Sequence, residues 1–198
     1  MQTSFKQFNL STPLTSALTK IGFNQPTPVQ VQTIPRLLAG HDVIVQSQTG
    51  SGKTHAFLLP LIQRLNDEQE LPQLVITAPS RELATQTYEM AKTLLQAAGM
   101  DKSLQLYVGG SDKAHQLKKL HHQQPDIVIG TPGRLLDLVS DVALRVDQVR
   151  FLVIDEADMT LDMGFFGSGR RHCQQDAQGF TNGGVLSDNS GTDAAVFA

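Results

Sequence analysis

The chain has 198 residues and a mass of 21.6 kDa, which suffices for one α/β domain with its own core but not for two full-sized domains. Hydrophobic residues make up 40% and charged residues 18% of the sequence, which is typical of a folded protein and excludes an intrinsically disordered one. The net charge of −3 excludes a strongly basic nucleic-acid binder, although contact with a nucleic-acid backbone needs only a few local donors.

Cysteine and apolar content restrict the class of protein further. Cys173 is the single cysteine, so no internal disulfide framework or multi-cysteine metal site can form. No run of 18 apolar residues occurs, and the residues at the start do not form a signal peptide. We therefore expect a cytoplasmic monomer without a membrane or disulfide partner.

Short apolar runs rich in β-branched residues alternate with segments of helical period. The expected helices and strands, in chain order, are helix 13–21, helix 28–38, strand 42–46, helix 54–65, strand 74–78, helix 82–97, strand 104–108, helix 112–121, strand 126–130, helix 135–138 and strand 151–154. Most strands are apolar without strict alternation, as in parallel strands that are buried on both faces. The pattern predicts an α/β fold in which crossover helices flank one twisted parallel sheet.

The composition changes near Gly167. Residues 168–198 contain no Lys and no Glu and are rich in Gly, Asp, Ser, Asn, Gln and Thr. The apolar residues of this tail lack a helical period, and only Gly184 to Leu186 could form a strand fragment. We expect the tail to be irregular.

A glycine-rich segment follows the first expected strand and opens a helix. Gly50 and Gly52 allow backbone conformations that point successive N–H groups at phosphate oxygens, and the helix N-terminus adds positive potential. Lys53 can reach the outer phosphates, and the Thr54 hydroxyl can bind Mg²⁺. The alternative is an ordinary glycine-rich turn, since the first glycine of the common phosphate-loop pattern is absent. The predicted phosphate-binding residues are Ser47, Gln48, Thr49, Gly50, Ser51, Gly52, Lys53 and Thr54.

The last expected strand ends in carboxylates. Asp155 and Glu156 follow the apolar run 151–154 at the carboxyl edge of the sheet, where open α/β folds bind ligands. Asp155 is predicted to hold Mg²⁺, largely through water, and Glu156 to orient the attacking water. Together with Lys53 they form the candidate catalytic set. Taken alone, the acidic segment would instead be a solvated helix start.

The phosphate loop, the Asp-Glu-Ala-Asp segment and four further motifs in the same order resemble the N-terminal RecA-like domain of DEAD-box RNA helicases. The resemblance covers residues 5–167. It implies a RecA-like P-loop NTPase fold, ATP and Mg²⁺ as cofactors, and ATP hydrolysis coupled to RNA strand separation. It also implies a Q-motif region over 1–32 and an incomplete ATP-binding domain over 33–167, followed by a tail outside the family over 168–198.

The segment from Gly22 to Gln30 resembles the adenine-reading Q motif of this family. The resemblance implies that the Gln30 amide presents both a donor and an acceptor to adenine and that Phe23 lines the same site.

Three further segments resemble the loops with which the family holds RNA. The resemblance implies sequence-independent contacts to the sugar-phosphate backbone of single-stranded or duplex RNA. It also gives Asp158 a role in coupling the two domains of the family. The implied RNA contacts are Pro79, Ser80, Arg81, Gly109, Gly110, Thr131, Pro132, Gly133 and Arg134.

The family's Ser-Ala-Thr motif and second RecA-like domain are absent from the sequence. We therefore expect a fragment that does not unwind RNA by itself. Back-translation of residues 179–190 with a shift of one nucleotide can restore an apolar strand and Ser-Ala-Thr, so we interpret the tail from about Ser168 as a frameshift product. Without that strand two central strands would lack a partner, which predicts marginal stability or aggregation.

Two alternative functions stay open. The chain could be a catalytically dead remnant that binds nucleotide or RNA, or a P-loop ATPase that does not act on nucleic acid. Outside the motifs, His121 and His122 are expected to end a solvated helix together with Lys118 and Lys119.

Overall fold

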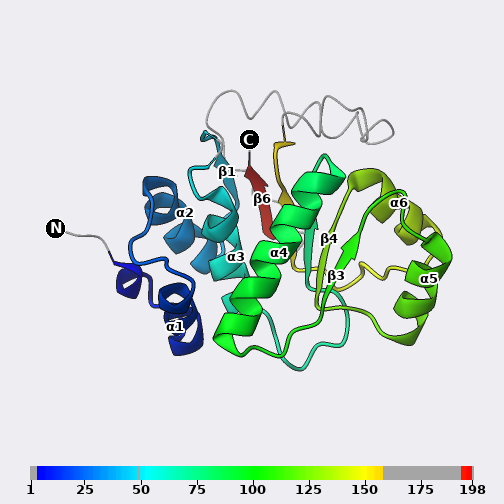
Figure 1. Cartoon of the computed structure of the whole chain (residues 1–198), viewed down its shortest axis with the longest axis horizontal. Coiled ribbons are helices and arrows are strands. Elements are labelled where there is room, and N and C mark those ends of the chain that lie inside the picture. Colours follow the sequence, from blue (N-terminus) through cyan, green and yellow to red (C-terminus); the bar gives the residue numbers. More distant parts are fainter. Residues whose placement is uncertain (1–3, 49, 158–192, 198) are drawn as a thin grey trace.

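The computed structural model describes residues 4–48, 50–157 and 193–197 (Figure 1). Its strands form one parallel sheet in the order β1-β6-β5-β2-β4-β3. The strands are β1 (Val43–Val45), β2 (Leu74–Thr77), β3 (Leu104–Tyr107), β4 (Ile127–Gly130), β5 (Phe151–Ile154) and β6 (Asp193–Phe197).

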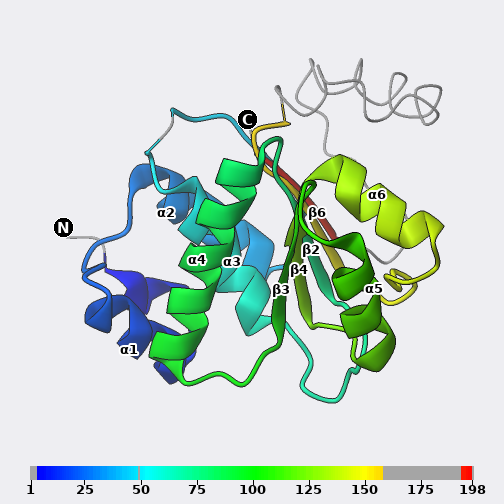
Figure 2. The same ribbon diagram turned by 45° about the vertical axis from the view of Figure 1, so that its right-hand side comes forward.

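Helices cover both faces of the sheet, with α3 and α4 on one side and α5 and α6 on the other (Figure 2). The described part contains no helix with the length and apolar character that crossing a membrane requires. The helical elements are the 3-10 helix η1 (Phe5–Phe8) and the α-helices α1 (Thr12–Lys20), α2 (Pro28–Leu38), α3 (Lys53–Gln63), α4 (Arg81–Ala98), α5 (Lys113–His122) and α6 (Pro132–Ser140).

The two cores follow from the alternation of side chains along the buried strands. In β4, Ile127 and Ile129 belong to the larger core beneath α1 to α4, whereas Val128 belongs to the smaller core beneath α5 and α6. All three side chains are fully buried, which explains why the strand sequence shows no polar alternation. The predicted α/β class, with a parallel sheet between two helical layers, is confirmed.

Caps set the ends of the helices that lead into the site. Ser80 accepts a hydrogen bond from the Leu83 N–H at 3.1 Å and is the N-cap of α4. Helix α6 begins at Pro132, three residues before the predicted start. Thr131 has the extended backbone that precedes a proline, and Pro132 then occupies the first helical position.

The tail supplies a strand that the sequence analysis did not predict. Residues 193–197 form β6, which pairs in parallel with β1 on one side and β5 on the other (Figure 1). The expectation that the tail is irregular throughout is wrong for these residues, and so is the expectation that β1 and β5 lack a partner. The predicted strand fragment at Gly184 to Leu186 lies outside the described residues.

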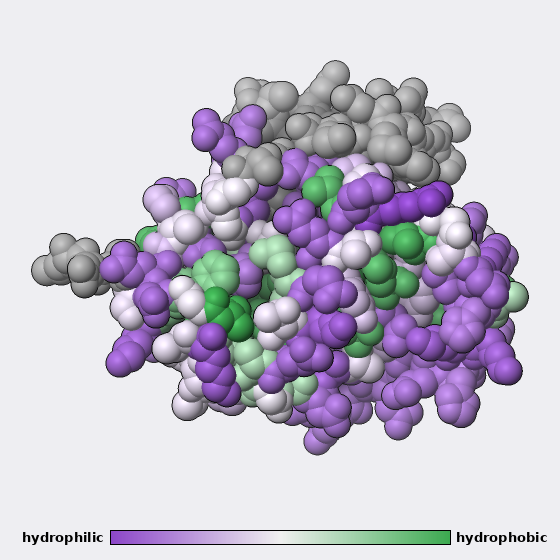
Figure 3. Space-filling view, viewed as in Figure 1, coloured by the Kyte–Doolittle hydropathy of each residue, from purple (hydrophilic) through white to green (hydrophobic). Residues whose placement is uncertain are grey.

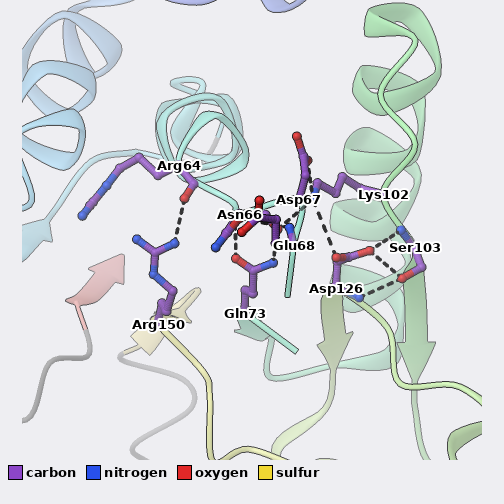
Figure 4. Close-up of polar contacts among 9 residues, drawn as sticks. All are labelled: Arg64, Asn66, Asp67, Glu68, Gln73, Lys102, Ser103, Asp126 and Arg150. Carbon is purple, nitrogen blue, oxygen red and sulfur yellow. Dashed lines mark hydrogen bonds and ion pairs between the residues drawn. The ribbon is translucent and has the colours of Figure 1, made fainter. Parts of the chain in front are cut away.

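A polar network closes the edge of the sheet at the amino ends of the strands (Figure 4). Asp126, before β4, accepts hydrogen bonds from the N–H and the hydroxyl of Ser103 at 2.8 and 2.7 Å. The Lys102 ammonium lies 2.7 Å from Asp67 and 3.8 Å from Asp126. This amino-end network fixes the starts of β3 and β4 and leaves the opposite, carboxyl edge for the candidate site.

Candidate active site

The phosphate loop joins β1 to α3. Gly50 and Gly52 have φ angles of +81° and +94°, in the left-handed region that glycine adopts without strain, and Gly52 is the N-cap of α3. Lys53 is the first helical residue. Its buried ammonium donates a hydrogen bond to the Ser47 carbonyl at 2.8 Å, and the Ser47 and Ser51 hydroxyls lie 2.8 Å apart. The segment therefore opens α3 with two glycines in the left-handed region; Gln48 is exposed on it, and Thr49 lies outside the described residues.

The acidic end of β5 meets this loop. The Lys53 ammonium lies 3.6 Å from the Glu156 carboxylate, although the two residues are about 100 positions apart in the sequence. Glu156 has a φ of +49°, a conformation that costs a non-glycine residue about 1–2 kcal/mol. Strain of this kind is typical of functional positions, because the surrounding structure must hold it in place.

Asp155 is a buried carboxyl group with 7% of its surface exposed. Burial, helped by the neighbouring Glu156 charge, raises the pKa of Asp155 to about 6, while Lys53 acts in the opposite direction. The Glu156 N–H donates to the Asp155 carboxylate at 3.1 Å, and the Thr87 hydroxyl donates to it from α4. Asp155 is therefore positioned by two donors at the edge of the sheet.

Gln30 links the predicted adenine-reading segment to the phosphate loop. Its side-chain oxygen accepts a hydrogen bond from the Thr27 N–H at 3.0 Å, and its amide nitrogen donates to the Gly52 carbonyl at 3.1 Å. A Cβ atom at Gly52 would lie 2.7 Å from that nitrogen and would displace it, and the φ of +94° strains any residue other than glycine. Gln30 is fully buried in this structure, and beyond these two bonds its amide has one further N–H and one further oxygen lone pair.

Phe23 stacks against His55 of α3, with ring centroids 4.4 Å apart. His55 is buried, and desolvation lowers its pKa, so the ring is neutral at pH 7. The stack attaches the start of the Q-motif segment to the helix that carries Lys53.

The three predicted RNA-contact segments share one pocket of about 580 Å³, which we call the Arg81–Arg134 pocket. It lies where the loops after β2, β3 and β4 meet, at the carboxyl edge of the sheet. The residues that line it are Pro79, Ser80, Arg81, Glu82, Gly109, Thr131, Gly133, Arg134 and Asp137. Of the predicted contacts, Pro132 is buried at the start of α6, and Gly110 is exposed next to the pocket.

The two arginines of this pocket are held on the loop after β3. A Cβ atom at Gly110, which has a φ of +80°, would lie 2.8 Å from the Arg81 Cζ, so the guanidinium lies directly over the glycine backbone. Arg134 donates to the side-chain oxygen of Gln116 at 2.6 Å and to the Ser111 carbonyl at 3.3 Å. Gln116 in turn donates to the Ser111 hydroxyl at 2.7 Å.

The sequence analysis did not predict a role for three residues of these sites. Thr87, His55 and Gln116 contact predicted site residues from other elements, and no spacing in the sequence marks such contacts. His55 could have been noticed because it directly follows the Lys-Thr pair of the loop. The predicted coupling residue Asp158 lies outside the described residues.

The donors around Lys53 fit magnesium. The Thr54 hydroxyl and the Asp155 carboxylate are hard oxygen donors, and nucleotide-bound Mg²⁺ takes one or two carboxylates, phosphates and water. Within the described ranges no group of three or more His, Cys, Asp or Glu residues could hold a metal by itself.

A phosphate loop that opens a helix and faces an acidic strand end across one edge of a parallel sheet defines the class of P-loop nucleotide-binding domains. The model of the DEAD/DEAH box helicase family matches residues 27–180, and the chain belongs to this family. The match passes Gly167, where we expected the resemblance to end.

Curated relatives and solved structures agree with the family. The chain is 50% identical over 161 residues to the DEAD-box ATP-dependent RNA helicase CshB of Listeria monocytogenes, an alignment that covers 81% of this chain and 37% of the relative. It is 44% identical to the ATP-dependent RNA helicase DeaD of Escherichia coli, over 83% of this chain and 26% of the relative. The chain thus spans about a third of the length of the curated relatives it matches.

A crystal structure of a DEAD box protein from Methanococcus jannaschii superposes with a TM-score of 0.81 and 31% identity, over 98% of this chain and 49% of that one. The structure of Saccharomyces cerevisiae dbp5 bound to gle1 and ip6 superposes with a TM-score of 0.79 and 29% identity, over 100% of this chain and 47% of that one. Together with the family match, these structures confirm the predicted RecA-like fold.

Proposed function

We propose that this chain is the ATP-binding domain of an ATP-dependent RNA helicase and that it binds ATP with Mg²⁺ between the phosphate loop and the end of β5. The observation that carries the proposal is the contact of Lys53 with Glu156 at 3.6 Å, because it brings the two motifs to one point of the sheet edge. The family match and the relatives named as RNA helicases support it.

Each residue of the site has a role that follows from its position. The Lys53 ammonium exchanges the Ser47 carbonyl and Glu156 for the outer phosphates and neutralises the charge that develops on them. The backbone N–H groups after Gly50 cradle the same phosphates. Glu156 orients the attacking water. Mg²⁺, held by Thr54 and Asp155 largely through water, would supply further charge neutralisation.

The Gln30 amide is proposed to recognise adenine with its remaining donor and acceptor, with Phe23 against the base. Its bonds to Thr27 and Gly52 support this role, because they hold the amide plane in one orientation beside the loop. The amide accepts one hydrogen bond from the base and donates one to it. Adenine offers a donor beside an acceptor for this pair of bonds, so the site favours adenine over guanine.

The Arg81–Arg134 pocket is proposed to bind the sugar-phosphate backbone of RNA, through charge-assisted bonds from its two arginines and exposed backbone N–H groups. We further propose that the protein acts in the cytoplasm as a monomer and that strand separation needs parts of the relatives outside the matched third. The relatives in which the match occurs are bacterial RNA helicases, which supports this setting.

Nucleotide binding by the purified chain tests the proposal. We expect a fluorescent ATP analogue to bind in the presence of Mg²⁺, Lys53→Ala to weaken binding by at least about tenfold, and Glu156→Gln to keep binding. Lys92→Ala is the matched control, since Lys92 lies on α4 away from the loop. Equal affinities of the wild type and Lys53→Ala would refute the proposal.

A P-loop ATPase that acts on something other than nucleic acid is a second candidate. It differs from the first in one measurement, the response to RNA. We expect Arg81→Ala and Arg134→Ala to weaken RNA binding and to leave ATP affinity unchanged. A wild-type chain that binds ATP but does not bind RNA would favour this candidate.

A further inference from the structure

Helix α5 presents a row of two lysines and two histidines that none of the motifs explains. His115, Lys118, Lys119 and His122 are spaced by three, four and seven residues, so they lie on one face of the helix. All four are exposed, and the row extends about 10 Å along the helix. Figure 3 shows a hydrophilic surface over this end of the molecule, where Figure 1 places α5.

These four side chains line a groove of about 400 Å³ between α5 and strand β3, which we call the α5 groove. Ser103, Gln105 and Tyr107 of the β3 segment form its other wall. Because β3 is at the edge of the sheet, no further strand covers the groove on that side among the described residues. The residues that line it are Ser103, Gln105, Tyr107, His115, Lys118, Lys119, His122, Gln123, Gln124 and Pro125.

The groove is positive although the chain as a whole is acidic. Its lining contains no Asp or Glu, and within the described part of the chain no ion pair involves Lys118 or Lys119. The acids around the groove are engaged by other groups. Asp126, which directly follows Pro125 of the lining, accepts from the Ser103 N–H and hydroxyl at 2.8 and 2.7 Å. Asp112 caps the α5 N-terminus, and Asp141, at the end of α6, pairs with Lys113 at 2.7 Å. A helix C-terminus favours cations by itself, but this does not account for a lining without a single acid.

The groove and the Arg81–Arg134 pocket are linked through β3 and α5, although no residue lines both. Gly109 lines the pocket, and Tyr107, two residues earlier in the chain, lines the groove. Gln116 of α5 is bonded to Arg134 and to Ser111, so the helix is fixed to the rim of the pocket. A polyanion that leaves the pocket over the loop after β3 therefore meets the exposed face of α5 next.

We propose that the α5 groove binds the phosphate backbone of the RNA strand beyond the Arg81–Arg134 pocket, with Lys118 and Lys119 as the main contacts. This inference rests on the proposed function, because it extends the same RNA site. Lysine contacts to phosphates carry no sequence information, so the groove adds affinity and length of contact but no sequence preference.

The test is RNA binding by the full chain, measured by fluorescence anisotropy with oligouridylates of about 6 and about 20 nucleotides over a range of salt concentrations. The variant is Lys118→Gln with Lys119→Gln. We expect affinity for the long RNA to fall about threefold or more and affinity for the short RNA to stay the same. The loss of two single-strand phosphate contacts should reduce the salt slope for the long RNA by about 1.4.

Lys6→Gln with Lys20→Gln is the matched control, since it makes the same change in net charge on η1 and α1, at the other end of the molecule (Figure 1). Equal effects of the two double variants would overturn the inference, as would an unchanged salt slope. Loss of binding to a polyglutamate peptide with unchanged RNA binding would assign the groove to an acidic protein segment and also overturn it. Failure of the wild type to bind either RNA would instead refute the proposed RNA function itself.

Discussion

Asp155 is less stable in its ionised form than an exposed aspartate because it is buried beside Glu156. Its folded-state pKa of about 6 lies above the ordinary value of 3.8, so the folded chain holds this proton more tightly than the unfolded chain does. The stability that the proton contributes is complete below pH 3.8 and is lost as the pH rises through about 6. At neutral pH the site therefore retains its charge for function at the expense of stability.

Asp155→Asn should accordingly raise the free energy of unfolding by about 1–3 kcal/mol at neutral pH, because the buried charge is removed while an oxygen acceptor remains. The gain should vanish near pH 4, where the wild-type carboxyl is protonated. Urea unfolding of the variant and the wild type at neutral pH and near pH 4 measures the gain and its disappearance. Asp147→Asn is the control, since Asp147 is exposed and the Arg145 side chain lowers its pKa, so no gain is expected. A variant less stable than the wild type at neutral pH would contradict the prediction.

Gln116 is expected to affect RNA binding through its hydrogen bond with Arg134. Gln116→Leu removes the 2.6 Å acceptor that holds the guanidinium, so we expect RNA affinity to fall about three- to tenfold while ATP affinity is unchanged. In an Arg134→Ala background the same substitution should have no further effect, and a double-mutant cycle measures this coupling. Gln96→Leu, at an exposed position of α4 that lines neither the Arg81–Arg134 pocket nor the α5 groove, is the control. Additive effects would show that Gln116 does not act through Arg134.

Among the elements, the amino-end network joins the starts of β3 and β4 in an asymmetric way. Lys102 has a side chain that is 5% exposed, whereas its closest partner Asp67 is 90% exposed and returns to water when the pair is broken. Asp126 instead satisfies two donors of Ser103 (Figure 4). Substitution of Asp126 and substitution of Lys102 should therefore lower the free energy of unfolding by different amounts.

We expect Asp126→Ala to lower the free energy of unfolding by about 2–4 kcal/mol, because it leaves the Ser103 donors without their acceptor and removes a carboxylate from beside a buried ammonium. Lys102→Met should cost less than about 1 kcal/mol, because a similar volume is kept and the exposed Asp67 needs no partner. Urea unfolding of the two variants gives the comparison. The reverse ranking would contradict this account of the network.

Most elements could be predicted from the sequence because their signals are local. The strand at Phe151–Ile154 and the helix at Pro28–Leu38 have the predicted bounds, since a β-branched run and a Thr-Pro cap mark their ends. Strand β6 could not be predicted, because Asp-Ala-Ala-Val-Phe has little β propensity and its pairing depends on the gap between β1 and β5.

The site residues, like the elements, were predictable where the signal is local in the sequence. Lys53 and Glu156 were predicted from the motifs, and the structure brings them within 3.6 Å. Thr87 and Gln116 escaped prediction because their roles arise only when α4 and α5 pack beside distant strands. The family resemblance supplied the motifs, whereas the residues that support the motifs needed the fold.

At the scale of the molecule, β6 completes the sheet, because it separates β1 from β5 and pairs with both. Deletion of residues 193–198 should abolish the cooperative unfolding transition, since β1 would then lose its partner in the described sheet and β5 would expose an edge of unpaired backbone groups. Circular dichroism during heating measures this. Deletion of Ala198 alone keeps the whole strand and is the control. A truncated chain that still melts cooperatively near the wild-type temperature would contradict the prediction.

The same strand sets when the domain can form during synthesis. Val43 leaves the ribosome early, yet its partner Ala195 follows about 150 residues later. Until then the nascent chain carries β1 and β5 with open edges, which are templates for pairing with other chains. Translation speed and access to chaperones over this interval should therefore decide how much of the protein reaches its native state.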